Sequence, residues 1–220
     1  MVKHFHSYSD LPRSLPLFPL SGVVLLPRGH LPLNVFEPRY LEMVDHALAG
    51  DRLIGMIQPS ENEASGNEKS VLKPRLAQVG CAGKIVSFQE TEDNRYLISL
   101  SGVCRFRLSG EMQATTPWRA GLADFAPFAG DLAQTHEEEF PRKRLLEALK
   151  TYLTSRDMQA DWDSVLTAPA EALINALAMM CPFDPVEKQA LLEAQTFQDR
   201  ASTLMALLEM GGEGGPSTLN

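Results

Sequence analysis

The residues whose types and spacing best suit a binding role form one short run, Phe36-Glu37-Pro38-Arg39-Tyr40. Two aromatic rings beside an acidic and a basic side chain could line a groove that contacts a polypeptide. A structural interpretation explains the same residues without a ligand: Glu37 lies near the N–H groups of the helix that it precedes, and Arg39 pairs with a nearby carboxylate or carbonyl. We prefer the structural interpretation and keep Phe36, Glu37, Arg39 and Tyr40 as the candidate polypeptide-binding residues.

A second candidate surface is basic. The alternation of a strand over 103–108 places Arg105 and Arg107 on one face, and Lys84 lies on another predicted strand. Such a stripe could hold RNA phosphates. The net charge of −8 and the lack of aromatic residues between the basic ones count against this alternative. Nucleic acid is therefore the less favoured partner.

The sequence contains no complete catalytic or cofactor motif. It has no Gly-x-x-x-x-Gly-Lys-Ser/Thr for ATP and no Gly-x-Ser-x-Gly for a hydrolase nucleophile. The run that starts at His136 resembles the zinc helix His-Glu-x-x-His, but Phe140 takes the place of the second histidine. His4 and His6 lie in a segment that we expect to be unstructured, and His46 is predicted to be a surface residue. We therefore expect no enzyme activity, no cofactor and no bound metal.

Three cysteines, Cys81, Cys104 and Cys181, are odd in number and widely spaced. This pattern favours buried or free thiols in a reducing compartment over a disulfide framework or a zinc site. Cys181 lies at the C-terminal end of a predicted helix, where the helix dipole raises the pKa of a thiol, so a nucleophilic role is not expected. The N-terminus lacks the apolar core of a signal peptide, and no run reaches the ~18 apolar residues of a membrane span. We expect a cytoplasmic protein that does not contact a membrane.

The candidate binding residues lie where an extended segment turns into a helix. Pro38 fits the first helical turn because its φ is fixed and its missing N–H needs no partner there, while the proline ring keeps Glu37 out of the α region. A helix is predicted over 38–49, and Gly50 follows where a left-handed cap is expected. Its buried face is predicted from apolar residues at helical spacing: Leu41, Val44 and Leu48.

The first part of the chain is predicted to be rich in β-structure. Prolines at 16, 19, 27 and 32 should confine the apolar segment 15–33 to edge or bulged strands. Further predicted strands cover 52–57, a hairpin of 80–88 and 95–100 ended by Gly102, the segment 103–108, and a stretch within 118–128. The polar segment 61–70 is predicted to be a surface loop, with a lid over a binding surface as the alternative.

The second part is predicted to be helical. Pro169 opens one helix, Asp184 and Glu187 form a capping box for another, and Thr196 caps a third. One apolar stripe precedes them, made of Leu145, Leu146, Leu149, Tyr152 and Leu153. The predicted domains are a flexible N-terminus (1–14), a β-rich part (15–128), a helical sub-domain (129–210) and a disordered tail (211–220). Strands followed by helices indicate the α+β class.

Several of these motifs resemble a known family. Leu15-Pro-Leu-Phe-Pro-Leu20 and the run from Pro32 to Tyr40 resemble the start of the Lon protease N-terminal domain, the substrate-recognition part of ATP-dependent Lon proteases, which also occurs alone and within cereblon. Segments 83–88 and 100–107 are similar to its barrel strands, and 183–193 to its helical part, so the resemblance covers about Leu15 to Leu208. It implies a small PUA-like β-barrel followed by an α-helical bundle.

The resemblance also implies a function. It points to a non-catalytic module that recognises unfolded or specific polypeptides, as an adaptor in protein quality control that presents substrates to a protease or holds misfolded chains. RNA binding is the alternative, because PUA-like barrels often serve that purpose. An active peptidase is the least favoured reading, because the sequence has no nucleophile–base pair and no nucleotide site. The identity of the partner, the binding face and the oligomeric state stay open.

Overall fold

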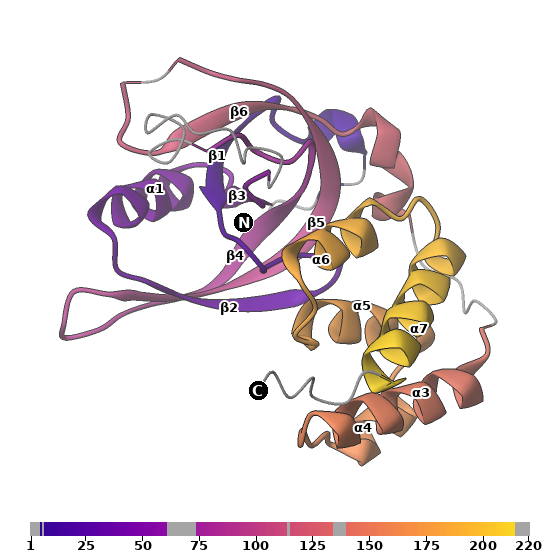
Figure 1. Ribbon diagram of the computed structural model, residues 1–220. Coiled ribbons are helices and arrows are strands. Elements are labelled where there is room, and N and C mark those ends of the chain that lie inside the picture. The colour runs from indigo at the N-terminus through magenta and orange to yellow at the C-terminus, as the bar shows by residue number, and fades with distance from the viewer. Residues whose placement is uncertain (1–4, 6, 61–73, 114, 134–139, 214–220) are drawn as a thin grey trace. The chain divides into compact units, whose positions relative to one another are not determined.

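The computed structural model of the protein describes residues 5, 7–60, 74–113, 115–133 and 140–213 (Figure 1). The chain divides into two compact units, residues 1–134 and 135–220. The predicted loop at 61–70 lies outside the described residues, as do His4, His6 and His136. Among the described helices, none is both long enough and apolar enough to cross a membrane.

In its described residues, the first unit combines strands with the helix α1 and two 3₁₀ helices. In chain order its elements are η1 (Tyr8–Asp10), β1 (Ser14–Pro19), β2 (His30–Val35), α1 (Pro38–Ala49), β3 (Leu53–Ile57), β4 (Val79–Glu90), β5 (Tyr96–Glu111), β6 (Arg119–Asp124) and η2 (Ala126–Leu132). Residues 129–132, which the sequence assigns to the helical part, belong to η2 and so to this unit.

The strands form one mixed sheet in the order β2-β5-β4-β3-β1-β6. β5 also pairs with β6, so that β5, β4, β3, β1 and β6 form a closed ring to which β2 is added as a further strand. The length of β5 makes this possible, because residues 96–101 pair with β2 while 107–111 pair with β6. The ring is the arrangement that a small barrel requires.

The prediction that prolines confine this segment to edge or bulged strands is correct for β2, an edge strand, and wrong for β1, which is neither. β2 carries Pro32 and, within the described sheet, pairs with β5 alone. β1 lies between β3 and β6, but each of its prolines is paired on one side only: Pro16 is opposite Ala120 of β6, and Pro19 is opposite Ile57 of β3. A missing N–H can therefore face the side where no ladder bond is needed.

The prediction that a strand ends at Gly102 is also wrong, because β5 continues through this residue. Another segment crosses closely here: a Cβ on Gly102 would lie 1.9 Å from the carbonyl oxygen of Leu26. The Arg28 amide donates to the Gly102 carbonyl (2.8 Å), and the Gly102 amide donates to the Gly29 carbonyl (2.8 Å). The glycine marks a close backbone approach.

Helix α1 begins at Pro38 as predicted, with Glu37 in an extended conformation at the N-cap. Its buried face differs from the prediction and consists of Tyr40, Met43, Val44 and Ala47. The face is set by Tyr40, whose ring lies 4.2 Å from that of Phe18 in β1. Gly50 is not left-handed (φ −113°); Arg52 takes that conformation instead (φ 61°).

The N-terminal segment is more ordered than predicted. Ser7 and Asp10 form a capping box around η1, in which the Ser7 amide donates to the Asp10 carboxylate at 3.0 Å. Leu11 is buried, and β1 begins at Ser14. The expectation of a flexible segment over 1–14 is therefore wrong for residues 7–14.

The second unit is helical, as predicted. Its helices are α3 (Arg142–Ser155), α4 (Trp162–Thr167), α5 (Ala170–Met180), α6 (Pro185–Glu193) and α7 (Phe197–Glu213). The capping box of Asp184 and Glu187 is present, and Thr196 caps α7 through an Oγ1 that accepts from the Asp199 amide at 3.1 Å.

The core of this unit follows the predicted stripe on α3, except that Ala148 is buried where Leu146 is half-buried. The prediction of a disordered tail from residue 211 is wrong for its first three residues, because α7 runs to Glu213. Gly211 packs on α3: a Cβ there would lie 2.6 Å from the Tyr152 ring. Residues 214–220 lie outside the described part of the chain.

Candidate functional site

The turn before α1 separates the candidate residues. Glu37 and Arg39 pair with each other, with 2.9 Å between Arg39 Nε and Glu37 Oε2, as the structural interpretation predicts for Arg39. Glu37 accepts helix N–H groups through its carbonyl oxygen, and its carboxylate makes no capping bond. Tyr40 is buried, and burial raises the pKa of its phenol. Tyr40 therefore positions the helix, and Phe36, Glu37 and Arg39 remain accessible.

Phe36 is the most exposed of the four residues, at 62%. It follows β2, and the Arg95 guanidinium carbon lies 5.7 Å from its ring centroid. Leu97 of β5 is 41% exposed and lies opposite Asn34 of β2 and Gln89 of β4. Because side chains alternate along strands, Asn34, Phe36 and Leu97 share one face of the sheet. Phe36 therefore has an apolar neighbour on β5.

Two more exposed apolar residues come from β4. Val86 lies at a register shift between β4 and β5, and Phe88 packs edge-on against Tyr96, with 4.9 Å between the ring centroids. Figure 1 shows the β4–β5 hairpin extending beyond the rest of the sheet with β2 alongside it. Phe88 lies opposite Ile98, and therefore on the other face of the sheet from Phe36 and Leu97. We call Phe36, Val86, Phe88 and Leu97, which lie on both faces of this end of the hairpin, the hairpin patch. The sequence analysis missed three of these residues, although the alternation of Tyr96 and Ile98 toward the core would have placed Leu97 outside.

The predicted basic stripe of Lys84, Arg105 and Arg107 is not formed. Arg105 is 4% exposed, and its backbone amide, Nε and Nη2 donate to the Asp131 carboxylate at 2.8–2.9 Å. Its guanidinium carbon lies 4.7 Å from the Phe128 ring centroid. The predicted alternation of side chains along this strand is correct. However, η2 covers the face of β5 that carries Arg105 and removes this side chain from solvent.

The cysteines are all buried and free, as expected. Burial raises the pKa of Cys104 to about 12 and that of Cys181 to about 11, and it raises the pKa of Cys81 as well. A thiol of this kind is not a nucleophile at neutral pH. Within the described residues, no group of three or more His, Cys, Asp or Glu side chains could hold a metal ion.

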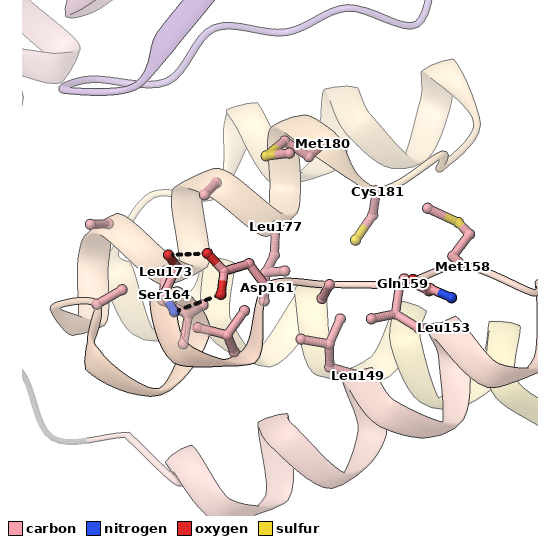
Figure 2. A pocket seen from close by; sticks show the side chains of 15 residues that line it. Leu149, Leu153, Met158, Gln159, Asp161, Ser164, Leu173, Leu177, Met180 and Cys181 are labelled. Atoms are coloured by element: carbon pink, nitrogen blue, oxygen red, sulfur yellow. Dashed lines mark hydrogen bonds between the residues drawn. The ribbon is translucent and has the colours of Figure 1, made fainter.

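The helical unit contains a pocket of about 480 Å³ that the sequence did not indicate. Figure 2 shows Leu149 and Leu153 of α3 on one side of it, and Leu177 and Cys181 on the other. α4 and the segment before it supply further walls, including Asp161 and Ser164. No short motif encodes this pocket, because its walls come from separate segments.

Comparison with known proteins places this arrangement in a family. The model of the ATP-dependent protease La (Lon) substrate-binding domain matches residues 14–210. The chain belongs to the Lon substrate-binding domain family. The match spans β1 to α7 and includes both the hairpin patch and the helical pocket.

The relatives are Lon proteases that are much longer than this chain. Lon protease 2 of Sorangium cellulosum is 27% identical over 205 residues, which cover 89% of this chain and 24% of that protein. The Lon protease of Desulfosudis oleivorans is 31% identical over 98 residues, which cover 44% of this chain and 12% of that protein. The chain therefore corresponds to a quarter or less of these relatives.

Two solved structures share the fold. The Lon N-terminal domain protein from Xanthomonas campestris is 24% identical with a TM-score of 0.59, and the match covers 88% of this chain and 97% of that one. The N-terminal domain of the Mycobacterium avium complex Lon protease is 15% identical with a TM-score of 0.60, covering 89% and 97%. At these identities the likeness shows the fold alone.

Proposed function

We propose that this chain is a non-catalytic polypeptide-recognition module of the Lon type, which binds apolar segments of unfolded polypeptides at the hairpin patch. Its cellular role is that of an adaptor in protein quality control in the cytoplasm, delivering bound chains to a protease or holding them. The family model that matches residues 14–210 describes a substrate-binding domain, which supports the general kind of binding.

The hairpin patch is the observation that carries the proposal. Its four side chains are 41–62% exposed, although each is large and apolar. Phe36 and Leu97 share one face of the sheet, and exposed apolar groups that gather on one face are typical of binding sites. Arg95 and the Glu37–Arg39 pair border Phe36, so polar groups rim the apolar contact area. An unfolded chain offers apolar side chains in extended segments, and such segments fit this surface.

The edge of β2 supports the same proposal. β2 is the last strand in the order of the described sheet, and Phe36 follows directly after it. An extended segment can add to such an edge through backbone hydrogen bonds, while alternate side chains reach the neighbouring surface. Strand addition beside β2 would place some of those side chains next to Asn34 and Phe36, on the face of the sheet that also carries Leu97.

The alternatives have less support. RNA binding was motivated by a stripe that included Arg105, and that side chain is engaged by Asp131 in the interior. For a peptidase, the buried thiols of Cys81, Cys104 and Cys181 have raised pKa values, which makes them poor nucleophiles. We therefore propose no catalytic step for this chain.

The test is fluorescence anisotropy of a labelled, permanently unfolded polypeptide titrated with the purified protein. We expect saturable binding to the wild type. The double substitution Phe36→Ser with Leu97→Ser should raise the Kd by about tenfold or more, because central apolar contacts carry most of the binding energy. Leu122→Ser is the matched control, since Leu122 of β6 is similarly exposed but lies outside the patch.

Three outcomes would count against the proposal. If Leu122→Ser weakens polypeptide binding as much as the double substitution does, the loss is not specific to the patch. Binding of mixed-sequence RNA in place of the polypeptide would favour the alternative. Cleavage of the polypeptide, with or without ATP, would contradict the non-catalytic role.

A further inference from the structure

The pocket of the helical unit has the shape of an open groove along α5. Ala172, Ala176 and Met180 recur at every fourth position of α5, line the pocket and are exposed. This spacing puts them on one face of the helix, about 12 Å from end to end at 1.5 Å per residue. The two alanines leave a hollow because they carry no side chain beyond Cβ. We call this surface, with Leu149, Leu153 and the α4 wall, the helical groove.

The apolar surface continues past the rim of the groove. Met180 is 79% exposed and Met158 is 38% exposed, and both line the pocket. Trp162 and Leu166 of α4 are also exposed, and they flank the lining residues Asp161 and Val165 in sequence. A small molecule would be enclosed by its pocket, whereas apolar surface that spreads beyond the rim favours a polypeptide. Methionine side chains adapt to differently shaped partners.

The lining of the groove is acidic at one point, and the basic groups near it are engaged: Arg142 donates to carbonyl oxygens of α4, and Arg156 lies over the Tyr152 ring. Among the described residues that line it, Asp161 is the only one with a charged side chain. Hydrogen bonds from Ser164 lower the pKa of the Asp161 carboxyl, so it stays ionised. Asp157 and Asp163 lie on either side of it in the chain and are exposed. A partner with basic residues next to its apolar ones would complement this rim.

Arg142 helps to hold the wall formed by α4 in place. α4 is six residues long, which is too short to be stable alone. Arg142 Nη2 donates to the carbonyl oxygens of Val165, Leu166 and Ala168 at 2.8–2.9 Å. Asp161 caps the other end of α4 through the Ser164 amide. The groove is therefore formed before a partner arrives.

We propose that the helical groove binds a basic amphipathic helix of a polypeptide partner, which inserts aliphatic side chains above Ala172 and Ala176 and places basic side chains beside Asp161. The inference rests on the proposed function, because it names a second class of segment that the module recognises. Ala172 and Ala176 lie about 6 Å apart along α5, which is the rise between positions i and i+4 of a partner helix, so side chains at those two positions enter together.

The probe is a fluorescein-labelled synthetic peptide of about 16 residues, built from repeated Leu-Lys-Lys-Leu units, which is long enough for a helix to form on binding. A second peptide has Glu at every Lys position. We expect the basic peptide to bind at least about fivefold more tightly than the acidic one. Ala176→Phe fills the hollow and should weaken binding of the basic peptide by about tenfold or more. Ala190→Phe on the exposed face of α6 should leave this binding unchanged. Asp161→Asn keeps the cap, removes the charge and should weaken binding about two- to fivefold.

The result can be separated from the proposed function. Phe36→Ser with Leu97→Ser should weaken binding of the unfolded polypeptide and leave binding of the basic peptide unchanged. Ala176→Phe should weaken binding of the basic peptide and leave binding of the unfolded polypeptide unchanged. Equal affinity for the basic and acidic peptides, or unchanged binding by Ala176→Phe, would overturn the proposal. A third outcome would also overturn it. If the basic peptide fails to bind, but the apolar dye anilinonaphthalene sulfonate binds and Ala176→Phe abolishes that binding, the groove is a small-molecule site.

Discussion

The hairpin patch and the helical groove are both exposed apolar surfaces, but the chain supports them differently. Phe88 and Leu97 of the patch lie in the backbone ladder of β4 and β5, Val86 lies at a register shift in β4, and Phe36 follows directly after β2. The groove depends on α4, which Arg142 holds through three carbonyl oxygens. The patch offers aromatic rings on a rigid sheet, while the groove offers alanines and methionines beside a short helix. A single surface substitution should therefore disturb the groove much more than the patch.

The patch can be disturbed through the interior of its unit, and this gives the largest expected effect. Arg105→Met leaves the Asp131 carboxylate buried without its partner, which should lower the free energy of unfolding by about 3–5 kcal/mol. Urea denaturation followed by Trp118 fluorescence, in a Trp162→Phe background, measures it. Replacing both partners, as Arg105→Met with Asp131→Leu, should recover much of the loss. No recovery would mean that the pair has another role.

The groove should respond to the loss of Arg142. Arg142→Ala removes the donor to three carbonyl oxygens, and we expect a loss of about 1–3 kcal/mol from the second unit. Trp162 lies on α4 and reports the change, in a Trp118→Phe background. Arg144→Ala is the matched control, because its pair with Glu209 is exposed. An effect of Arg144→Ala as large as that of Arg142→Ala would contradict the assigned support of α4.

Alkaline pH should weaken both units through their thiols. The folded pKa values of about 12 for Cys104 and about 11 for Cys181 exceed the ordinary value of 9.0. Above pH 9 the unfolded thiols lose protons that the folded ones keep, so stability is complete below pH 9 and falls as pH rises toward 11. Urea midpoints from pH 8 to 10.5 would show the decline, and Cys104→Ala should make it shallower. A midpoint that rises over this range would contradict the assignment.

The smallest effect is expected at the turn before α1. Arg39→Ala breaks an ion pair that is about half exposed on each side. Such pairs contribute roughly 0–1 kcal/mol, so the melting temperature should change little. Binding of the unfolded polypeptide per folded molecule should also fall by less than about threefold, because Arg39 borders the patch without belonging to it. A larger loss of binding would move the centre of the site from Phe36 to Arg39.

The elements were predictable where local chemistry decides them. Pro38 starts α1, Asp184 and Glu187 cap α6, and the hairpin of β4 and β5 follows from its polar turn. In each case the residues that decide the structure lie within a few positions of one another. The α+β class followed from the order of these elements.

What could not be predicted depends on residues far apart in the chain. Arg105 is buried because Asp131, 26 positions later, returns to cover it. Gly102 is required because Leu26 crosses β5. The helical groove is lined by apolar residues of separate segments, and no local pattern predicts that Ala176 and Asp161 line the same pocket. The candidate site was predicted in part: Phe36 is exposed, Tyr40 is buried, and the residues of β4 and β5 were missed.

Hydrogen–deuterium exchange of the protein, with and without a saturating unfolded polypeptide, tests the central claim most directly. Peptides that cover 30–36 and 86–97 should exchange more slowly in the complex, because the patch and the edge of β2 become covered. The segments 14–19 and 119–124 serve as internal controls and should not change. Protection confined to 142–180, with none at 30–36 or 86–97, would contradict the hairpin patch as the binding site.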